Sequence, residues 1–153
     1  MYFILLIASM LSVAEGGHSL VARDINGKII NTDDHKDKII MLNFWATWCA
    51  PCMVEMPHLQ EIQNKYKDDL LLISISVDEA RDRSKIKPLM KTGGYDFVVI
   101  HDADRSLVNI YNPSMSLPYS VIIGYDREII HQSAGYQHGK ELIFEKILYN
   151  IIK

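Results

Sequence analysis

The feature that most constrains the fold is a continuous apolar segment at residues 38–45 (KIIMLNFW). An unbroken run of this length is typical of a strand buried on both faces of a helix-covered sheet. A second such run follows at 70–77 (LLLISISV), and the intervening residues 50–66 have the apolar spacing of an amphipathic helix. The sequence therefore predicts an α/β fold around a buried central sheet.

The remaining predicted elements continue the alternation of strands and helices. A hairpin with an Asn26-Gly27 turn opens the domain at residues 20–30. After residue 77 we expect a helix at 80–92, a strand at 97–100, a short helix at 105–111, antiparallel strands at 120–125 and 128–133, and a helix at 139–152. This order predicts a mixed sheet with helices on both faces.

Composition and charge exclude several classes of protein. The chain has 16 Lys and Arg residues against 19 Asp and Glu residues, and its net charge of -3 provides no basic surface for nucleic acid. Its 2 Cys residues allow at most one internal disulfide, so the fold must depend on an apolar core. The length of 153 residues fits one domain, which we expect at residues 15–153.

The N-terminal residues 2–13 (YFILLIASMLSV) form an apolar run. A bilayer-spanning helix needs about 20 residues, whereas a secretory signal has a shorter apolar core followed by small residues, as at Ser12 and Ala14. We expect residues 1–14 to be a signal peptide cleaved after Ala14. A short uncleaved anchor and a misplaced or cropped start are the alternatives, because the first residues lack the usual positive charge.

Both Cys residues lie in the segment Trp48-Cys49-Ala50-Pro51-Cys52, where the buried strand leads into the helix. Free N–H groups and the dipole at a helix N-terminus favour a thiolate, so Cys49 is the candidate nucleophile at an exposed helix end. Cys52 should face inward one turn later and attack a mixed disulfide formed at Cys49. The spacing predicts a pair that alternates between dithiol and disulfide.

A metal site and an inert buried pair are the competing interpretations of the two Cys residues. A zinc site needs about four ligands, and none of the His residues provides a second ligand pair at a suitable spacing. His101-Asp102-Ala103-Asp104 also resembles a metal-binding sequence, but Asp at a turn and helix start more commonly accepts backbone hydrogen bonds. We therefore expect neither a metal nor an organic cofactor.

Residues 43–52 (NFWATWCAPC), followed by 55–57 (EMP), resemble the active-site segment of the thioredoxin superfamily. They most resemble the exported TlpA/ResA-like thiol-disulfide oxidoreductases, and the similarity extends from the hairpin to the closing helix. The resemblance implies a thioredoxin-like fold with an extra N-terminal β-hairpin. It also implies an inserted strand-helix element before Pro118, for which residues 78–115 provide the length.

The resemblance also implies how a substrate is bound. Leu117 and Pro118 precede strand 120–125 as in the cis-proline loop of the family, which packs against the two cysteines. Pro118 is therefore our cis candidate, with a trans strand-entry proline as the alternative. The Leu117 backbone would then pair with an extended substrate beside Cys49. Trp48 is either an apolar lid over the site or a packed aromatic.

Glu55 matches an acidic position of the TlpA/ResA-like group, one helical turn after Cys52. Thioredoxin itself has a buried Asp where this chain has Asn43, whose amide cannot take a proton. Cys52 needs a proton acceptor when it attacks, and Glu55 with a pKa raised by burial is the best candidate. The alternative is a solvated carboxylate on the helix surface.

Two further features receive structural interpretations. Pro57 should kink its helix, as in the long active-site helix of the superfamily. The basic stretch in the predicted helix at 80–92 is interpreted as a solvated face, with a partner surface as the alternative. It contains Arg81, Arg83, Lys85, Lys87 and Lys91.

Together, the residues and the resemblance predict an exported thiol-disulfide oxidoreductase that reduces substrate disulfides through Cys49 and Cys52. The resemblance implies a disulfide-bearing protein substrate, a membrane thiol reductant of the DsbD/CcdA type, a periplasmic or membrane-anchored location and cytochrome c maturation as a client pathway. Ala50-Pro51 lacks the His of strongly oxidising members, which favours a reductant. The rivals are a thiol peroxidase relative, whose Pro-x-x-x-Thr-x-x-Cys pattern is absent, and a binding module without turnover.

Overall fold

The computed structural model describes residues 17–153, so the predicted signal peptide at 1–14 lies outside the described residues. The elements in chain order are β1 (Val21–Arg23), β2 (Ile29–Asn31), the 3₁₀ helix η1 (Thr32–His35), β3 (Ile39–Trp45), α1 (Ala50–Lys65), β4 (Leu70–Ser76), the 3₁₀ helix η2 (Ala80–Asp82), α2 (Arg83–Gly93), β5 (Val98–His101), α3 (Ser106–Tyr111), β6 (Tyr119–Ile123), β7 (Ile129–Ala134) and α4 (Lys140–Ile152).

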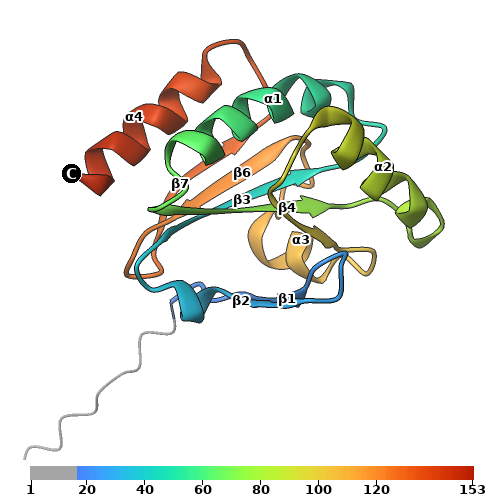
Figure 1. Ribbon diagram of the computed structural model, residues 1–153, viewed down its shortest axis with the longest axis horizontal. Coiled ribbons are helices and arrows are strands. Elements are labelled where there is room, and N and C mark those ends of the chain that lie inside the picture. Colours follow the sequence, from blue (N-terminus) through green and yellow to red (C-terminus); the bar gives the residue numbers. More distant parts are fainter. Residues whose placement is uncertain (1–16) are drawn as a thin grey trace, which may run out of the picture.

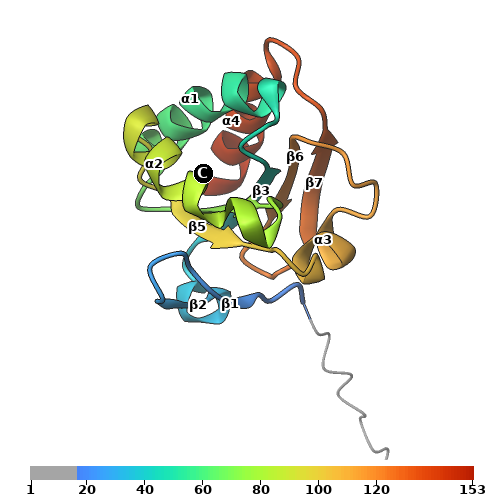
Figure 2. The same ribbon diagram turned by 90° about the vertical axis from the view of Figure 1, so that its right-hand side faces the viewer.

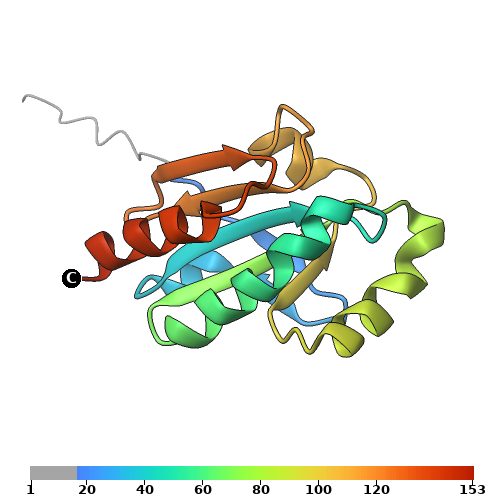
Figure 3. The same ribbon diagram turned by 90° about the horizontal axis from the view of Figure 1, so that it is seen from above.

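A five-stranded mixed sheet in the order β5-β4-β3-β6-β7 forms the centre of the fold, and β1 and β2 form a separate antiparallel hairpin. Helices α1 and α4 lie side by side over one face of the sheet, whereas α3 and the hairpin lie on the opposite face (Figures 1 and 3). Helix α2 flanks the sheet near β5 (Figure 2). The predicted fold class is confirmed: a mixed sheet with helices on both faces, an N-terminal hairpin and an insertion between β4 and β6.

Strand β3 is the central strand that its apolar run predicts. All seven of its residues are buried, and it pairs in parallel with β4 and antiparallel with β6. Phe44, near its carboxyl end, lies opposite Tyr119, the first residue of β6. The chain therefore leaves β3 for α1 at the same edge of the sheet at which it enters β6.

Arg127, in the turn between β6 and β7, joins the hairpin region to the sheet. Its buried guanidinium donates hydrogen bonds to the carbonyl oxygens of Thr32 at 2.5 Å, His35 at 2.9 Å and Lys38 at 3.2 Å. Those carbonyl groups belong to η1 and to the segment that follows it. The sequence analysis did not predict η1. Arg127 therefore adds hydrogen bonds to carbonyl groups of η1 and of the segment that leads into β3.

The predicted elements are confirmed, and their ends differ from the observed ones by at most three residues. The predicted helix at 80–92 begins instead as η2, and α2 starts only at Arg83. Pro57 lies inside α1, which continues past it as one helix. Within residues 17–153, no helix combines the length and the apolar character that crossing a membrane requires.

Asp102 confirms the structural interpretation of the His101-Asp102-Ala103-Asp104 sequence. Its carboxylate accepts hydrogen bonds from the backbone N–H groups of Leu107 at 3.1 Å and Val108 at 2.9 Å, and from the Ser106 hydroxyl at 3.1 Å. These bonds satisfy donors at the start of α3. Asp102 is thus a helix-capping residue.

Candidate active site

Cys49 caps the N-terminus of α1, as the sequence predicts. Its Sγ accepts a hydrogen bond from the N–H of Cys52 at 3.3 Å, and a disulfide bond joins the two residues. Cys52 is 1% exposed and faces inward as expected, but Cys49 is only 4% exposed. The expectation of an exposed Cys49 is therefore wrong for the disulfide form, because both contacts hold its Sγ against the first turn of α1.

Asp78, two residues after the end of β4, fixes the loop that leads from β3 to Cys49. Its buried carboxylate accepts hydrogen bonds from the backbone N–H of Thr47 at 3.0 Å and from the Thr47 hydroxyl at 2.6 Å. The Ser76 hydroxyl donates a third at 2.7 Å. The loop is thus tied to the neighbouring strand of the sheet, which limits the positions that Cys49 can take.

The Leu117–Pro118 peptide bond is cis, which confirms the prediction for Pro118. The register of β3 and β6 places these residues at the edge of the sheet from which the chain leads to Cys49. Pro118 is buried and its carbonyl oxygen accepts a hydrogen bond from the N–H of Gly135 at 2.8 Å, whereas Leu117 is half-buried. The predicted substrate-binding residues and the cysteines therefore share one edge.

Trp48 is 67% exposed and precedes Cys49 directly. The side chain does not pack into the core, unlike that of Trp45, which is fully buried in β3. An exposed indole beside a reactive sulfur offers a large apolar surface to a bound molecule. The packed-aromatic alternative does not fit this exposure, and the role of Trp48 as a lid stays a prediction.

Glu55 is 2% exposed, so the alternative of a solvated carboxylate does not hold. Its Oε2 accepts a hydrogen bond from Nδ2 of Asn43 at 2.8 Å, and its Oε1 lies 3.2 Å from Nζ of Lys140. Asn43 also donates to the Ser120 hydroxyl oxygen at 3.0 Å. The side chain that replaces the buried Asp of thioredoxin is thus a direct partner of Glu55.

Burial raises the pKa of the Glu55 carboxyl above its ordinary value. The positive charge of Lys140 and the hydrogen bond from Asn43 oppose this rise, while the charge of Glu141 adds to it. A carboxyl group with a raised pKa is better matched to accepting a proton from a thiol than an ordinary surface carboxylate is. The arrangement at Glu55 is therefore suited to general acid–base chemistry one helical turn after Cys52.

Lys140 is a residue of the site that the sequence analysis missed. It is the first residue of α4, far along the chain from β3 and α1, and only the packing of α4 beside α1 brings it to Glu55 (Figure 3). One signal was present in the sequence. A Lys at a helix N-terminus is unfavourable for the helix dipole, so such a residue needs a compensating partner.

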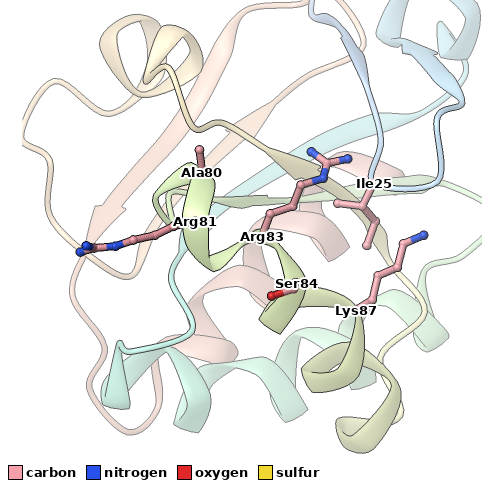
Figure 4. A pocket seen from close by; sticks show the side chains of 6 residues that line it. All are labelled: Ile25, Ala80, Arg81, Arg83, Ser84 and Lys87. Atoms are coloured by element: carbon pink, nitrogen blue, oxygen red, sulfur yellow. The ribbon is translucent and has the colours of Figure 1, made fainter.

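The basic stretch lies on η2 and α2. Arg81 forms an ion pair with Glu79 at 3.0 Å. A pocket at the start of α2 is lined by Arg81, Arg83 and Lys87 among others, and Arg81 points away from the other two basic side chains (Figure 4). Lys85 pairs with Asp82 at 2.7 Å. These contacts fit the interpretation of a solvated face. In the part of the chain that the structure describes, no three His, Cys, Asp or Glu side chains gather as a metal site requires.

Comparison with known proteins now assigns the family. Residues 17–132 match the model of the AhpC/TSA family. The chain belongs to the AhpC/TSA family. It is 32% identical over 132 residues to the thiol-disulfide oxidoreductase ResA of Bacillus thuringiensis strain Al Hakam, an alignment that covers 86% of this chain and 75% of that protein. ResA of Bacillus subtilis strain 168 is 32% identical over 126 residues, which cover 81% of this chain and 69% of that protein.

A solved structure gives the same fold. The thiol:disulfide interchange protein of the thioredoxin family from Chlorobium tepidum TLS superposes with a TM-score of 0.76 at 23% identity, over 90% of this chain and 95% of that chain. The resemblance to the thioredoxin superfamily is confirmed. This member of the AhpC/TSA family is a thiol-disulfide oxidoreductase with a thioredoxin-like fold.

The raised pKa of Glu55 predicts a pH-dependent contribution to stability. The folded protein binds this proton more tightly than the unfolded chain does, so the contribution is complete below the ordinary carboxyl pKa and is lost as the pH rises through the raised pKa. The measurement is urea unfolding of the oxidised protein at several pH values. Between the ordinary and the raised pKa, the free energy of unfolding of the wild type should fall relative to that of Glu55→Gln, by about 1.4 kcal/mol for each pH unit.

Glu61→Gln is the matched control, because Glu61 is an exposed residue of the same helix. If the difference between wild type and Glu55→Gln were constant with pH, or increased with pH, the raised pKa would be contradicted.

Proposed function

We propose that this oxidoreductase reduces the disulfides of protein substrates, with Cys49 as the nucleophile and Cys52 as the resolving thiol. The observation that carries the proposal is the position of the pair. Cys49 caps α1 at an edge of the sheet, while Cys52 lies one turn deeper on the helix that also bears the buried Glu55. This asymmetry supports two different roles for two thiols of the same kind.

In the first step, the Cys49 thiolate attacks one sulfur of the substrate disulfide. The substrate S–S bond breaks, a mixed disulfide forms at Cys49, and the first substrate sulfur leaves as a thiolate that takes up a proton. The N–H of Cys52 donates to the Cys49 sulfur in the disulfide form, at 3.3 Å. The same N–H is placed to stabilise the thiolate that begins the reaction.

In the second step, the Cys52 thiol transfers its proton to the Glu55 carboxylate. The Cys52 thiolate then attacks the Cys49 sulfur, the Cys49–Cys52 bond forms, and the second substrate sulfur leaves and is protonated. The substrate gains two electrons and the pair loses two. Cys52 is buried, so a proton acceptor on its own helix replaces the bulk water that cannot reach it freely.

Substrate binding is assigned to Trp48, Leu117 and Pro118. Leu117 lies just before β6 at the edge that leads to Cys49, where its backbone is placed to pair with an extended segment of the substrate. The exposed indole of Trp48 provides apolar contact beside the reacting sulfur. Backbone pairing with an apolar contact favours unfolded or extended protein segments over small disulfides.

The proposed location and partners follow from the same chemistry. Residues 1–14 serve as a signal peptide or short anchor, and residues 15–153 work outside the cytoplasm. In such an oxidising compartment the pair must be reduced again by a dedicated donor, for which we propose a membrane thiol reductant of the DsbD/CcdA type. Cytochrome c maturation is the proposed client pathway. These assignments rest on the resemblance of residues 43–57 to the exported TlpA/ResA-like thiol-disulfide oxidoreductases.

Cys52→Ser should trap substrates as mixed disulfides, because its Cys49 can attack but nothing resolves the product. The reduced variant is mixed with oxidised extracytoplasmic proteins of the source cell, and conjugates are identified by non-reducing electrophoresis and mass spectrometry. Cys49→Ser is the control and should give few conjugates. Capture through Cys49→Ser would reverse the two roles. Capture by neither variant, together with no reduction of insulin disulfides by the wild type, would favour a binding module without turnover.

Export predicts a mature chain that begins near Glu15, detected by mass spectrometry of the extracytoplasmic fraction. An intact Met1 in the membrane fraction would support the anchor instead. A full-length chain found wholly in the cytosol would contradict export.

A further inference from the structure

A buried ion pair joins Lys140 of α4 to Glu55 of α1, with 7% and 2% of the two side chains exposed. We propose that Lys140 is a positioning residue that keeps Glu55 in its ionised, proton-accepting form while the Cys49–Cys52 pair reacts. The inference rests on the proposed function, in which Glu55 takes the proton of Cys52.

The contacts of the Glu55 carboxyl group are complementary to a carboxylate. Nζ of Lys140 lies 3.2 Å from Oε1, and Nδ2 of Asn43 donates to Oε2 at 2.8 Å. Oε2 thus has a hydrogen-bond donor from β3, and Oε1, which accepts no hydrogen bond from the described residues, has the Lys140 ammonium of α4 at ion-pair distance. A protonated carboxyl would need an acceptor for its own O–H, whereas a carboxylate only accepts. Lys140 and Asn43 therefore stabilise the ionised form against the opposing effect of burial.

Lys140 is held in place by its own surroundings. Its Nζ donates a hydrogen bond to the carbonyl oxygen of Gly135 and lies 5.4 Å from the centroid of the Phe144 ring. Because Lys140 begins α4, the helix dipole opposes its positive charge there. The Gly135 carbonyl oxygen, the Phe144 ring and Glu55 together offset this unfavourable interaction with the dipole and the free-energy cost of burying the charge.

Without the cation, burial would neutralise Glu55. An isolated buried carboxylate takes up a proton and does not remain charged in a low-dielectric interior. Burial raises the pKa of Glu55, and Lys140 is the strongest influence that lowers it. A Glu55 that already carried a proton at neutral pH could not accept one from Cys52, so loss of Lys140 would act on the second step of the reaction.

Other ionisable groups around the pair act more weakly. The charge of Glu141 opposes Lys140 at Glu55, but Glu141 is engaged by the Tyr136 hydroxyl at 3.2 Å. His58 of α1 stacks on the Tyr136 ring, with 6.1 Å between the centroids. Burial and the charge of Lys140 lower the pKa of His131 on β7, which favours its neutral form. Among the described residues, Lys140 is therefore the cation in direct contact with Glu55.

Lys140→Met tests the proposal, since Met keeps an apolar stem against Phe144 and removes the charge. Insulin reduction is measured from pH 5 to pH 9. We expect the acidic limb of the pH–rate profile to shift to higher pH by about one to three units. The rate on that limb should fall at least about tenfold, and the rate at pH 9 should change little. Lys146→Met, at an exposed position of the same helix, is the control for charge and should keep the wild-type profile.

The double variant Glu55→Gln/Lys140→Met separates this inference from the proposed function. If Lys140 acts through Glu55, its substitution should not change the profile further once Glu55 is Gln. An equal effect of Lys140→Met in both backgrounds would overturn the inference and leave the role of Glu55 intact. A wild-type profile for Glu55→Gln itself would overturn the role of Glu55 in the proposed function, and the inference with it.

A second variant covers the case in which Lys140→Met does not fold. Lys140→Arg keeps the buried charge, and we expect it to keep the position of the acidic limb. If Lys140→Arg folds but moves the acidic limb upward by a pH unit or more, a positive charge at this position does not control Glu55, and the inference is wrong.

Discussion

The contact of Glu55 with Asn43 and Lys140 is the interaction on which the rest of the site depends. It joins three elements that are far apart in the chain: the central strand β3, the active-site helix α1 and the closing helix α4. A buried carboxylate is costly unless hydrogen bonds and an opposite charge compensate it. The contact therefore links α1 and α4 to the central strand in addition to the apolar residues that pack these helices on the sheet.

The two cysteines near this contact have different surroundings. Cys49 ends the loop that Asp78 ties to β4 and receives an N–H from the first turn of α1. Cys52 faces the interior on the helix that bears Glu55. In the proposed mechanism, the helix terminus favours a thiolate at the first position, and Glu55 takes the proton of the buried thiol at the second. Position alone thus supports separate chemical roles for the two sulfurs.

Local patterns in the sequence were sufficient to predict the strands of the sheet and most of the helices. The apolar run of β3 and the spacing within α1 depend on neighbouring residues, and family resemblance added the cis bond at Pro118 and the burial of Glu55. Lys140, Asp78 and Arg127 were not predicted as structural contacts. Each is a polar residue whose partners lie on other elements, at distances along the chain that periodicity does not report. The η1 helix was missed for a related reason, because it is short and is held by Arg127.

The titration of Glu55 in the wild-type protein tests the central claim most directly. The carboxyl carbon of a glutamate labelled with ¹³C can be followed by NMR over pH in both the oxidised and the reduced protein. The account predicts a pKa above the ordinary carboxyl value in the oxidised protein, and in the reduced protein a titration that is coupled to that of Cys52. A Glu55 that titrates at the ordinary value in both states, with no sign of the thiols in its curve, would contradict it.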